Sequence, residues 1–106
     1  MGKKTPTVRS LEMLREKYPL VQVVEKWNPH ARIRQDLYGI IDILCVGNGE
    51  TIAVQTTAGS SVSARVKKMT ESPALPHLRE AGWRIIIQGW RKNAAGKYVL
   101  REVDLS

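Results

Sequence analysis

A short turn sequence between two apolar segments constrains the fold of this chain more than any other feature. Gly47-Asn48-Gly49-Glu50 separates the apolar run that ends at Val46 from the run that begins at Thr51. Glycine and asparagine accept the positive φ angles that a tight β-turn requires, so the pattern predicts a β-hairpin. If residues 47–50 form its loop, Val46 pairs with Thr51, and the same register places Asp42 opposite Gln55.

This register brings three polar side chains together on an otherwise apolar sheet. Asp42 lies inside the apolar run 38–45, and Thr57 lies two residues beyond Gln55 on the same face of its strand. A carboxylate in such a strand loses hydration unless it is paired, hydrogen-bonded or bound to a cation. Three interpretations stay open: Asp42 and Gln55 satisfy each other through a hydrogen bond, this end of the hairpin is exposed, or the carboxylate binds a ligand.

The spacing of apolar residues predicts the remaining elements. Helical spacing predicts helices over residues 7–18, with Thr7 as N-cap, over 62–69 after Ser61, and over 73–81. Alternating or continuous apolar runs predict five strands, with a turn or loop at 28–35; the strands cover residues 20–27, 37–46, 51–57, 83–90 and 97–103. The resulting order αβββααββ is typical of an α/β domain with a mixed sheet.

Composition narrows the class of protein. A chain of 106 residues suits one domain spanning residues 1–106, with residues 1–6 flexible, and its 17 Lys+Arg against 10 Asp+Glu give a net charge of +7. That excess favours a polyanionic partner, most often nucleic acid. No apolar run approaches the roughly 18 residues of a membrane span. The single cysteine, Cys45, cannot form an internal disulfide, so we expect a cytoplasmic protein with no membrane partner.

The hairpin and the order of elements resemble the PD-(D/E)xK nuclease superfamily. Gly39-Ile40-Ile41-Asp42 resembles its Asp-bearing strand, and Ala53-Val54-Gln55-Thr56-Thr57 falls where its acid-x-Lys strand stands. The segment of likeness runs from Thr7 to Met69 and is most similar to small Holliday-junction-resolvase-like and phage-type endonucleases. The resemblance implies a restriction-endonuclease-like three-layer core of about five strands flanked by helices. It also implies a DNA endonuclease that hydrolyses phosphodiester bonds with Mg²⁺ or Mn²⁺.

The resemblance assigns roles to the residues of the hairpin. It implies that Asp42 and Gln55 bind the metal, with the main-chain carbonyl of Thr56 as a further ligand and Thr57 at the position of the catalytic lysine. Gln55 is neutral where the family has an acid, although its carbonyl oxygen is a hard ligand that Mg²⁺ accepts. Threonine cannot replace a lysine that stabilises developing negative charge. The second carboxylate is expected from one of two residues, Glu25 or Asp36.

Basic residues near this site are the candidates for phosphate contacts. On the helix after Thr57, Lys68 is expected to supply the missing catalytic cation, with Arg65 and Lys67 as nucleic-acid contacts; the alternative is a solvated helix face. In the predicted loop 28–35, two arginines are expected to contact phosphates. The alternative there is a solvated loop with an internal ion pair to Asp36. These two loop residues are Arg32 and Arg34.

Gln55 and Thr57 also fit two functions other than catalysis. One is a nucleic-acid-binding module that keeps the nuclease fold without its chemistry, with binding that is salt-sensitive and independent of metal. The other is a protein-interaction or assembly domain, in which the charge of +7 only maintains solubility. Because a chain of this size has little surface to contact a duplex, a homodimer is a further expectation.

Overall fold

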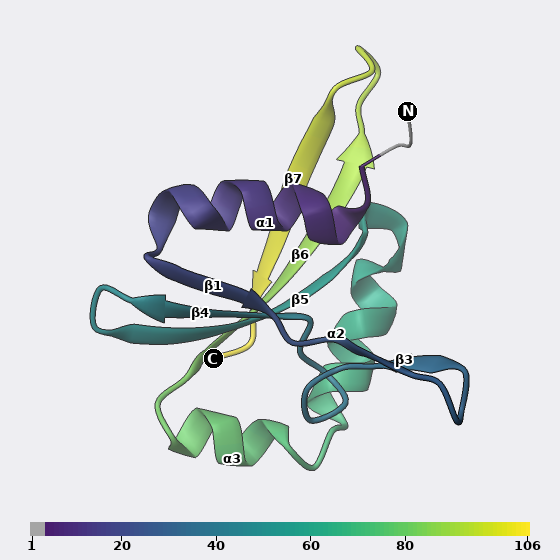
Figure 1. Cartoon of the computed structure of the whole chain (residues 1–106). Helices are drawn as coiled ribbons and strands as arrows, with labels where there is room; N and C mark the ends of the chain where they lie inside the picture. Colours follow the sequence, from purple (N-terminus) through teal and green to yellow (C-terminus); the bar gives the residue numbers. More distant parts are fainter. Residues whose placement is uncertain (1–3) are drawn as a thin grey trace.

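A five-stranded mixed sheet forms the centre of the fold in the computed structural model, which describes residues 4–106 (Figure 1). The strand order is β1-β4-β5-β6-β7; β5 and β6 run parallel, and the other neighbouring pairs are antiparallel. The bounds are β1 Leu20–Val23, β4 Ile43–Gly47, β5 Glu50–Ala58, β6 Arg84–Lys92 and β7 Tyr98–Asp104. The predicted mixed sheet is therefore confirmed, and the two middle helices join parallel neighbours.

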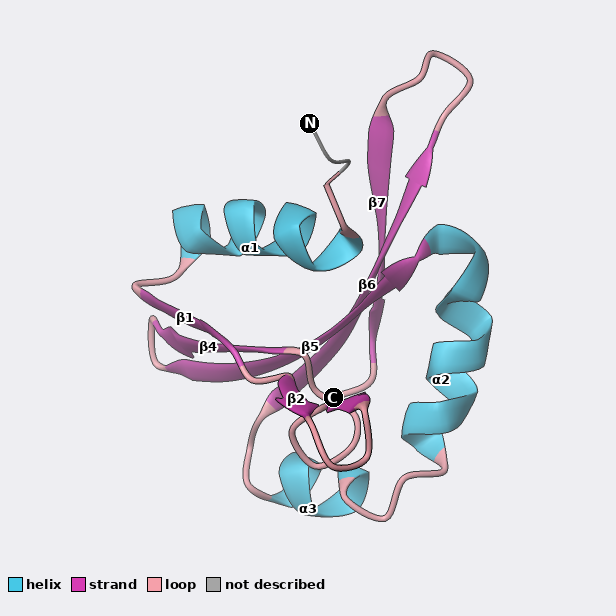
Figure 2. Cartoon of the chain, turned by 45° about the vertical axis from the view of Figure 1, so that its right-hand side comes forward, coloured by secondary structure: helices cyan, strands magenta, loops and turns pink. Residues whose placement is uncertain are grey.

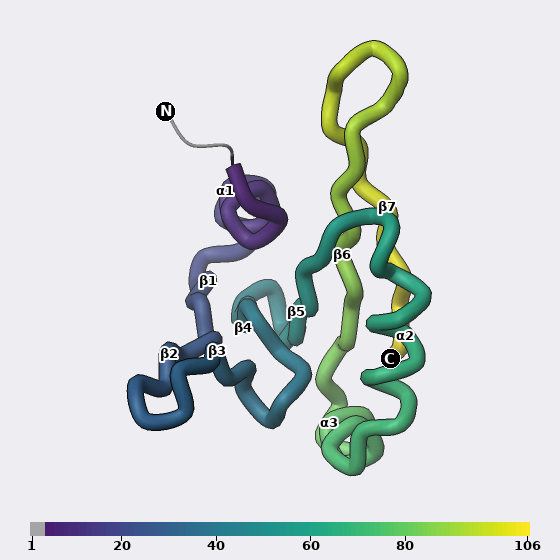
Figure 3. Tube along the Cα trace, turned by 90° about the vertical axis from the view of Figure 1, so that its right-hand side faces the viewer, coloured from purple at the N-terminus to yellow at the C-terminus, as the bar shows by residue number. Residues whose placement is uncertain are grey.

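Helices cover both faces of this sheet, which gives the predicted three layers. Helix α1 (Pro6–Lys17) lies on one face, and α2 (Val62–Thr70) and α3 (Leu75–Glu80) lie on the other (Figures 2 and 3). Each face has its own apolar core: Leu14 packs on one side, and Met69 on the other. Among residues 4–106, none of the three α-helices is long and apolar enough to cross a membrane.

The predicted hairpin forms with the predicted register. Val46 pairs with Thr51 and Ile43 with Val54 across β4 and β5, and Asn48 has the positive φ of 55° that the turn requires. Strand β5 is longer than β4 and continues past it to Ala58. The end of β5 therefore lacks a β4 partner, which leaves room for side chains beside it.

Two predicted strands are shorter than expected, and the predicted loop at 28–35 is wrong. The chain leaves the sheet after β1 and forms a two-stranded hairpin of β2 (Lys26–Asn28) and β3 (Ile33–Gln35), which projects from the body of the fold (Figures 1 and 3). The strand predicted over 37–46 begins only at Ile43. The reason is a tight turn in which Tyr38 and Gly39 both adopt positive φ angles, of 54° and 77°, which extended backbone does not allow.

Helix α1 begins two residues earlier than predicted. The Thr5 hydroxyl accepts a hydrogen bond from the backbone N–H of Val8 at 3.2 Å, so Thr5 is the N-cap and Pro6 is the first helical residue. Pro6 thus belongs to α1, the flexibility of residues 1–6 stays a prediction, and residues 1–3 lie outside the described part. On this helix Val8 is 39% exposed, whereas Ser10 is buried and accepts a hydrogen bond from the indole of Trp90.

Helix α2 approaches the sheet closely at one glycine. A Cβ atom at Gly89 of β6 would overlap the Cγ2 atom of Val62, the first residue of α2. Val62 is fully buried, so this contact fixes the distance between the start of α2 and the strands below it. The rest of α2 then extends along the face of the sheet that carries Gln55.

Candidate metal centre

Asp42 lies at a junction of three strands. Its backbone N–H donates to the Val54 carbonyl at 2.9 Å, and its own carbonyl accepts from the Val24 N–H at 2.8 Å. Its position immediately before β4 is therefore fixed by β5 on one side and by the continuation of β1 on the other. The residue is only 3% exposed, so its carboxylate depends on protein partners.

The Asp42 side chain takes the place of a missing strand partner. Because β5 continues past β4, the backbone N–H of Thr56 has no carbonyl opposite it and donates to Asp42 Oδ2 at 2.8 Å. The Thr56 hydroxyl donates to the same oxygen at 3.0 Å, and so does the Gln55 amide. The predicted juxtaposition of Asp42 and Gln55 is confirmed, as is the interpretation in which they hydrogen-bond each other.

A second carboxylate reaches the same place through the tight turn at 37–41. Leu37 and Ile41 form a β-bridge, so Asp36 and Asp42 lie directly outside that bridge on facing segments. The Gln55 Nε2 atom, which binds Asp42, also lies 3.4 Å from Asp36 Oδ2. One amide group therefore bridges two carboxylates.

A third carboxylate completes a cluster. Glu25 follows Val24, whose N–H bonds Asp42, and one carboxylate oxygen from each of Glu25, Asp36 and Asp42 lies within 4.8 Å of the others. The sequence left open whether Glu25 or Asp36 is the second acid, and the fold places both beside Asp42. We call these three residues the carboxylate cluster.

Close approach of the acids changes the protonation of Asp36. Burial, together with the hydrogen bond and the negative charge of Asp42, raises the pKa of Asp36 from 3.8 to about 7, although Gln55 and Lys68 act in the opposite direction. Asp36 is therefore partly protonated near neutral pH. A cation that replaced this proton would remove the repulsion between the carboxylates.

The donor atoms of the cluster fit a hard divalent cation. Carboxylate and amide oxygens are the ligands that Mg²⁺, Ca²⁺ and Mn²⁺ prefer. Gln55 is 1% exposed, and its Oε1 atom has no hydrogen-bond partner among the described residues. Rotation of this amide by half a turn would exchange its nitrogen and oxygen, so that Oε1 would face the carboxylates in place of Nε2. The site thus contains an unused oxygen donor beside three acids.

The cluster opens into a cavity of about 450 Å³ that also contains cations. Arg34 of β3 donates to Glu25 Oε1 at 2.9 Å, so the predicted ion pair of Arg34 with Asp36 is replaced by one with Glu25. Arg65 and Lys68 line the cavity from α2, as their spacing of three residues allows. The acids and the cations that line the cavity are therefore equal in number.

The structure also places four other residues that the sequence assigned to the site. Thr57 is buried and lines the cavity with its neutral hydroxyl. Lys67 is exposed on α2 and does not line the cavity, and Arg32 lies exposed in the turn that joins β2 to β3 with a φ of 54°. The carbonyl of Thr56 points to the same side of β5 as its N–H, which bonds Asp42.

Thr7 is a site residue that the sequence did not indicate. Its hydroxyl lies 2.9 Å from the hydroxyl of Thr56, and it lines the cavity at the start of α1. The interpretation of Thr7 as N-cap hid this role. The pair Thr5-Pro6 could have indicated the true start of the helix, because threonine is a common N-cap and proline is common at the first helical position. That start places Thr7 inside the first turn.

Comparison with protein-family models, with curated proteins and with solved structures finds no significant match to this chain. The resemblance to PD-(D/E)xK nucleases consequently stays a prediction from the hairpin residues.

Proposed function

We propose that this protein is a divalent-metal-dependent DNA endonuclease that hydrolyses phosphodiester bonds. The observation that carries the proposal is the carboxylate cluster, in which one oxygen of each acid lies within 4.8 Å of the others, beside a Gln55 oxygen that has no hydrogen-bond partner within residues 4–106. Bound Mg²⁺ or Mn²⁺ supplies Lewis-acid polarisation of a phosphate and acidifies water. The cations around the cluster and the net charge of +7 favour a phosphodiester substrate.

Residues of the cavity have two roles in this proposal, metal binding and stabilisation of negative charge. Asp42 and Asp36 would hold the metal, and Gln55 would offer its amide oxygen after rotation of its amide group. Lys68 and Arg65, from a different element, face the same cavity and stabilise the negative charge that develops on the phosphate. Lys68 thus does from α2 what a lysine at position 57 would do from β5.

Cleavage assays test the proposal directly. Branched, duplex and single-stranded DNA are incubated with the protein in Mg²⁺, in Mn²⁺ and in EDTA. We expect cleavage only with metal, and a loss of at least about 100-fold in the Asp42→Asn variant, since removal of charged groups from such sites costs several kcal/mol. Glu80→Gln, at an exposed carboxylate of α3, is the matched control and should cut normally. Absence of cleavage by the wild-type protein on every substrate would refute the proposal.

Two adjacent lysines on α2 test whether Lys68 supplies the cation that is missing at position 57. Lys68 lines the cavity and Lys67 does not, although both are exposed and both lose one charge in a glutamine variant. We expect Lys68→Gln to lower kcat by about 10-fold or more with intact metal binding, and Lys67→Gln to retain normal kcat. Equal effects of the two variants would remove Lys68 from the mechanism.

A second function, DNA binding without catalysis, has one observation in its favour. The Gln55 amide donates to Asp42 and lies within 3.4 Å of Asp36, so it contacts both carboxylates in the place that a cation would take. This function predicts salt-sensitive DNA binding that neither EDTA nor Asp42→Asn changes. Sedimentation of the protein alone and with DNA tests the homodimer expected from its size.

A further inference from the structure

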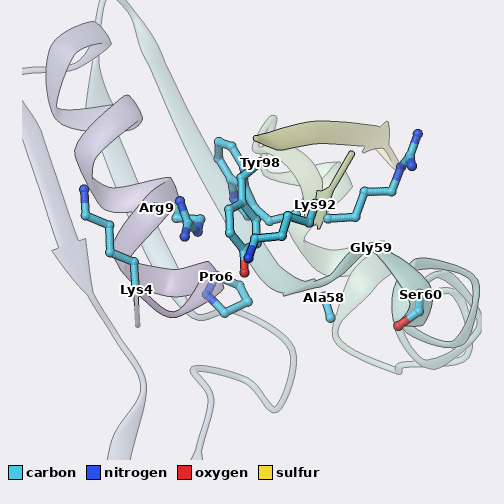
Figure 4. A pocket seen from close by; sticks show the side chains of 10 residues that line it. Lys4, Pro6, Arg9, Ala58, Gly59, Ser60, Lys92 and Tyr98 are labelled. Carbon is cyan, nitrogen blue, oxygen red and sulfur yellow. The ribbon is translucent and has the colours of Figure 1, made fainter. Parts of the chain in front are cut away.

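A second cavity, of about 520 Å³, lies beside the carboxylate cluster and has the opposite character. It is formed by the start of α1, by the connection from β5 to α2 and by the outer ends of β6 and β7 (Figure 4). Four of the side chains that line it are cationic and none is acidic. They are Lys4, Arg9, Arg91 and Lys92, and we call this the basic cavity.

Most of its cations lack acidic partners. Lys4 forms an ion pair with Glu12 at 3.0 Å. Within residues 4–106, the other three cations of the basic cavity form no ion pair, and the buried Nε atom of Arg9 has no hydrogen-bond acceptor. A buried donor such as this Nε atom is costly to leave without an acceptor, whereas the exposed Arg91 and Lys92 are free to bind an anion from solution.

An aromatic ring arranges two of these cations. The Arg9 guanidinium lies 3.4 Å from the centroid of the Tyr98 ring, and the Lys92 ammonium lies 5.7 Å from it (Figure 4). The ring therefore holds both charges near one side of the cavity through cation–π attraction. Arg9 covers one face of the Tyr98 ring, and the Trp90 indole N–H donates to Ser10, so the cations are the groups that offer hydrogen-bond donors to a ligand here. The ligand chemistry here is that of phosphate.

The two cavities are neighbours. Pro6 and Ala58 line both of them, and Ala58 directly follows Thr57 of the carboxylate cavity. A chain of phosphates with one member at the carboxylate cluster would reach the basic cavity by passing the end of β5. The cations of the basic cavity would offset the repulsion between these phosphates and the three acids of the carboxylate cluster.

We propose that the basic cavity binds backbone phosphates of a DNA strand, next to the phosphate that lies at the carboxylate cluster. The position of the DNA strand in this proposal rests on the proposed function. The presence of a phosphate-binding site does not. Guanidinium and ammonium groups recognise phosphate oxygens without reading bases. Binding through this cavity is consequently independent of DNA sequence.

The test is the salt dependence of DNA binding, measured by fluorescence anisotropy with a labelled duplex in EDTA, where cleavage cannot occur. In Arg91→Gln/Lys92→Gln, both substitutions fall on exposed positions. We expect the slope of log Kd against log salt to fall by about 1.8, at about 0.9 per lost phosphate contact, and Kd near 0.1 M salt to rise at least about 10-fold. Arg91→Lys/Lys92→Arg keeps both charges and should bind normally.

A matched double variant separates the cavity from overall charge. Arg15→Gln/Lys17→Gln removes two charges from the other end of α1, where both residues are exposed, and should leave the slope within about 0.5 of the wild-type value. Equal losses in the two double variants, no DNA binding by the wild-type protein at low salt, or equal displacement of DNA by polyglutamate would overturn the proposal.

Cleavage in Mn²⁺, measured separately, distinguishes this proposal from the proposed function. If Arg91→Gln/Lys92→Gln weakens binding and the wild-type protein cuts no DNA, the phosphate site stands and the endonuclease does not. If the protein cuts DNA and this variant binds normally, the endonuclease stands and the phosphate site is refuted.

Discussion

Replacing Asp36 by asparagine should stabilise the metal-free protein while weakening its metal binding. Asparagine keeps the shape of the side chain but removes the negative charge that faces Asp42. At pH 8 the wild-type Asp36 is ionised in the folded and the unfolded state, and only the folded state brings it close to the other acids. The variant avoids the burial of a charge, which is the largest cause of the raised pKa, and also this repulsion, so its free energy of unfolding is higher.

The size of the effect follows from the pKa of Asp36. A rise from 3.8 to about 7 is roughly 3 pKa units, which sets an upper limit of about 4 kcal/mol at 1.36 kcal/mol per unit. Asp36 is only partly buried, and solvent screening lowers this figure to about 1–2 kcal/mol. For a domain of this size that corresponds to an increase in Tm of about 5–10 °C.

The pH dependence gives the prediction its sign. Because the folded-state pKa lies above the unfolded one, the contribution of Asp36 to stability is fully present below about pH 4 and is lost as the pH rises through about 7. The difference in Tm between the variant and the wild-type protein should therefore be near zero at pH 4 and largest above pH 8.

Thermal unfolding in EDTA and in Mn²⁺, followed by circular dichroism, provides the measurement. Mn²⁺ at about 100 times its Kd should add about 2.7 kcal/mol to the wild-type protein and much less to Asp36→Asn. Glu80→Gln, which removes an exposed carboxylate far along the chain in α3, should behave as wild type in both conditions. The reasoning is refuted if Asp36→Asn melts at or below the wild-type temperature at pH 8 in EDTA.

Four other substitutions extend these tests. Gln55→Glu should bind Mn²⁺ more tightly in calorimetry and lower the Tm in EDTA, because it adds a fourth acid to the cluster; unchanged affinity would exclude position 55 as a ligand. Asp42→Asn should lose Mn²⁺ binding and about 1–3 kcal/mol of stability in urea unfolding, because it replaces an acceptor of three hydrogen bonds. Ser10→Ala should cost about 1–2 kcal/mol and alter tryptophan fluorescence by removing the acceptor of the Trp90 indole, without change in Mn²⁺ affinity. Thr5→Ala should cost about 1 kcal/mol through loss of the N-cap, and a neutral result in thermal unfolding would contradict the assigned start of α1.

The parts of the site that local sequence determines could be predicted. The turn at 47–50 determines the pairing of β4 with β5, because its glycines and asparagine accept the positive φ angles that a tight turn requires. That register alone places Asp42 beside Gln55. The layers follow as well, since the apolar stripe of α1 and the stripes of α2 and α3 must cover opposite faces.

The carboxylate cluster as a whole could not be predicted, because two of its members depend on contacts that the sequence does not encode locally. Tyr38 adopts a left-handed conformation that is uncommon for an aromatic residue, and this turn brings Asp36 to Asp42. The position of Glu25 depends on the pairing of β1 with β4, in which Val23 lies opposite Ile43, twenty residues later in the chain. The spacing of apolar residues predicted that the strands over 20–27 and 37–46 run straight through these bends, because apolar residues occupy the bends as well.

The closeness of Gly89 to Val62 makes the start of α2 a pivot for the cations of the site. Arg65 and Lys68 stand three and six residues beyond Val62, about 4.5 Å and 9 Å along the helix axis. A side chain at position 89 would push Val62 outward, and a tilt of about 10° would displace Lys68 by roughly 1.5 Å. Displacements of that size are enough to misalign reacting groups. Gly89, which has no functional group, thereby positions the two cationic side chains, and its substitution would move them relative to the carboxylate cluster.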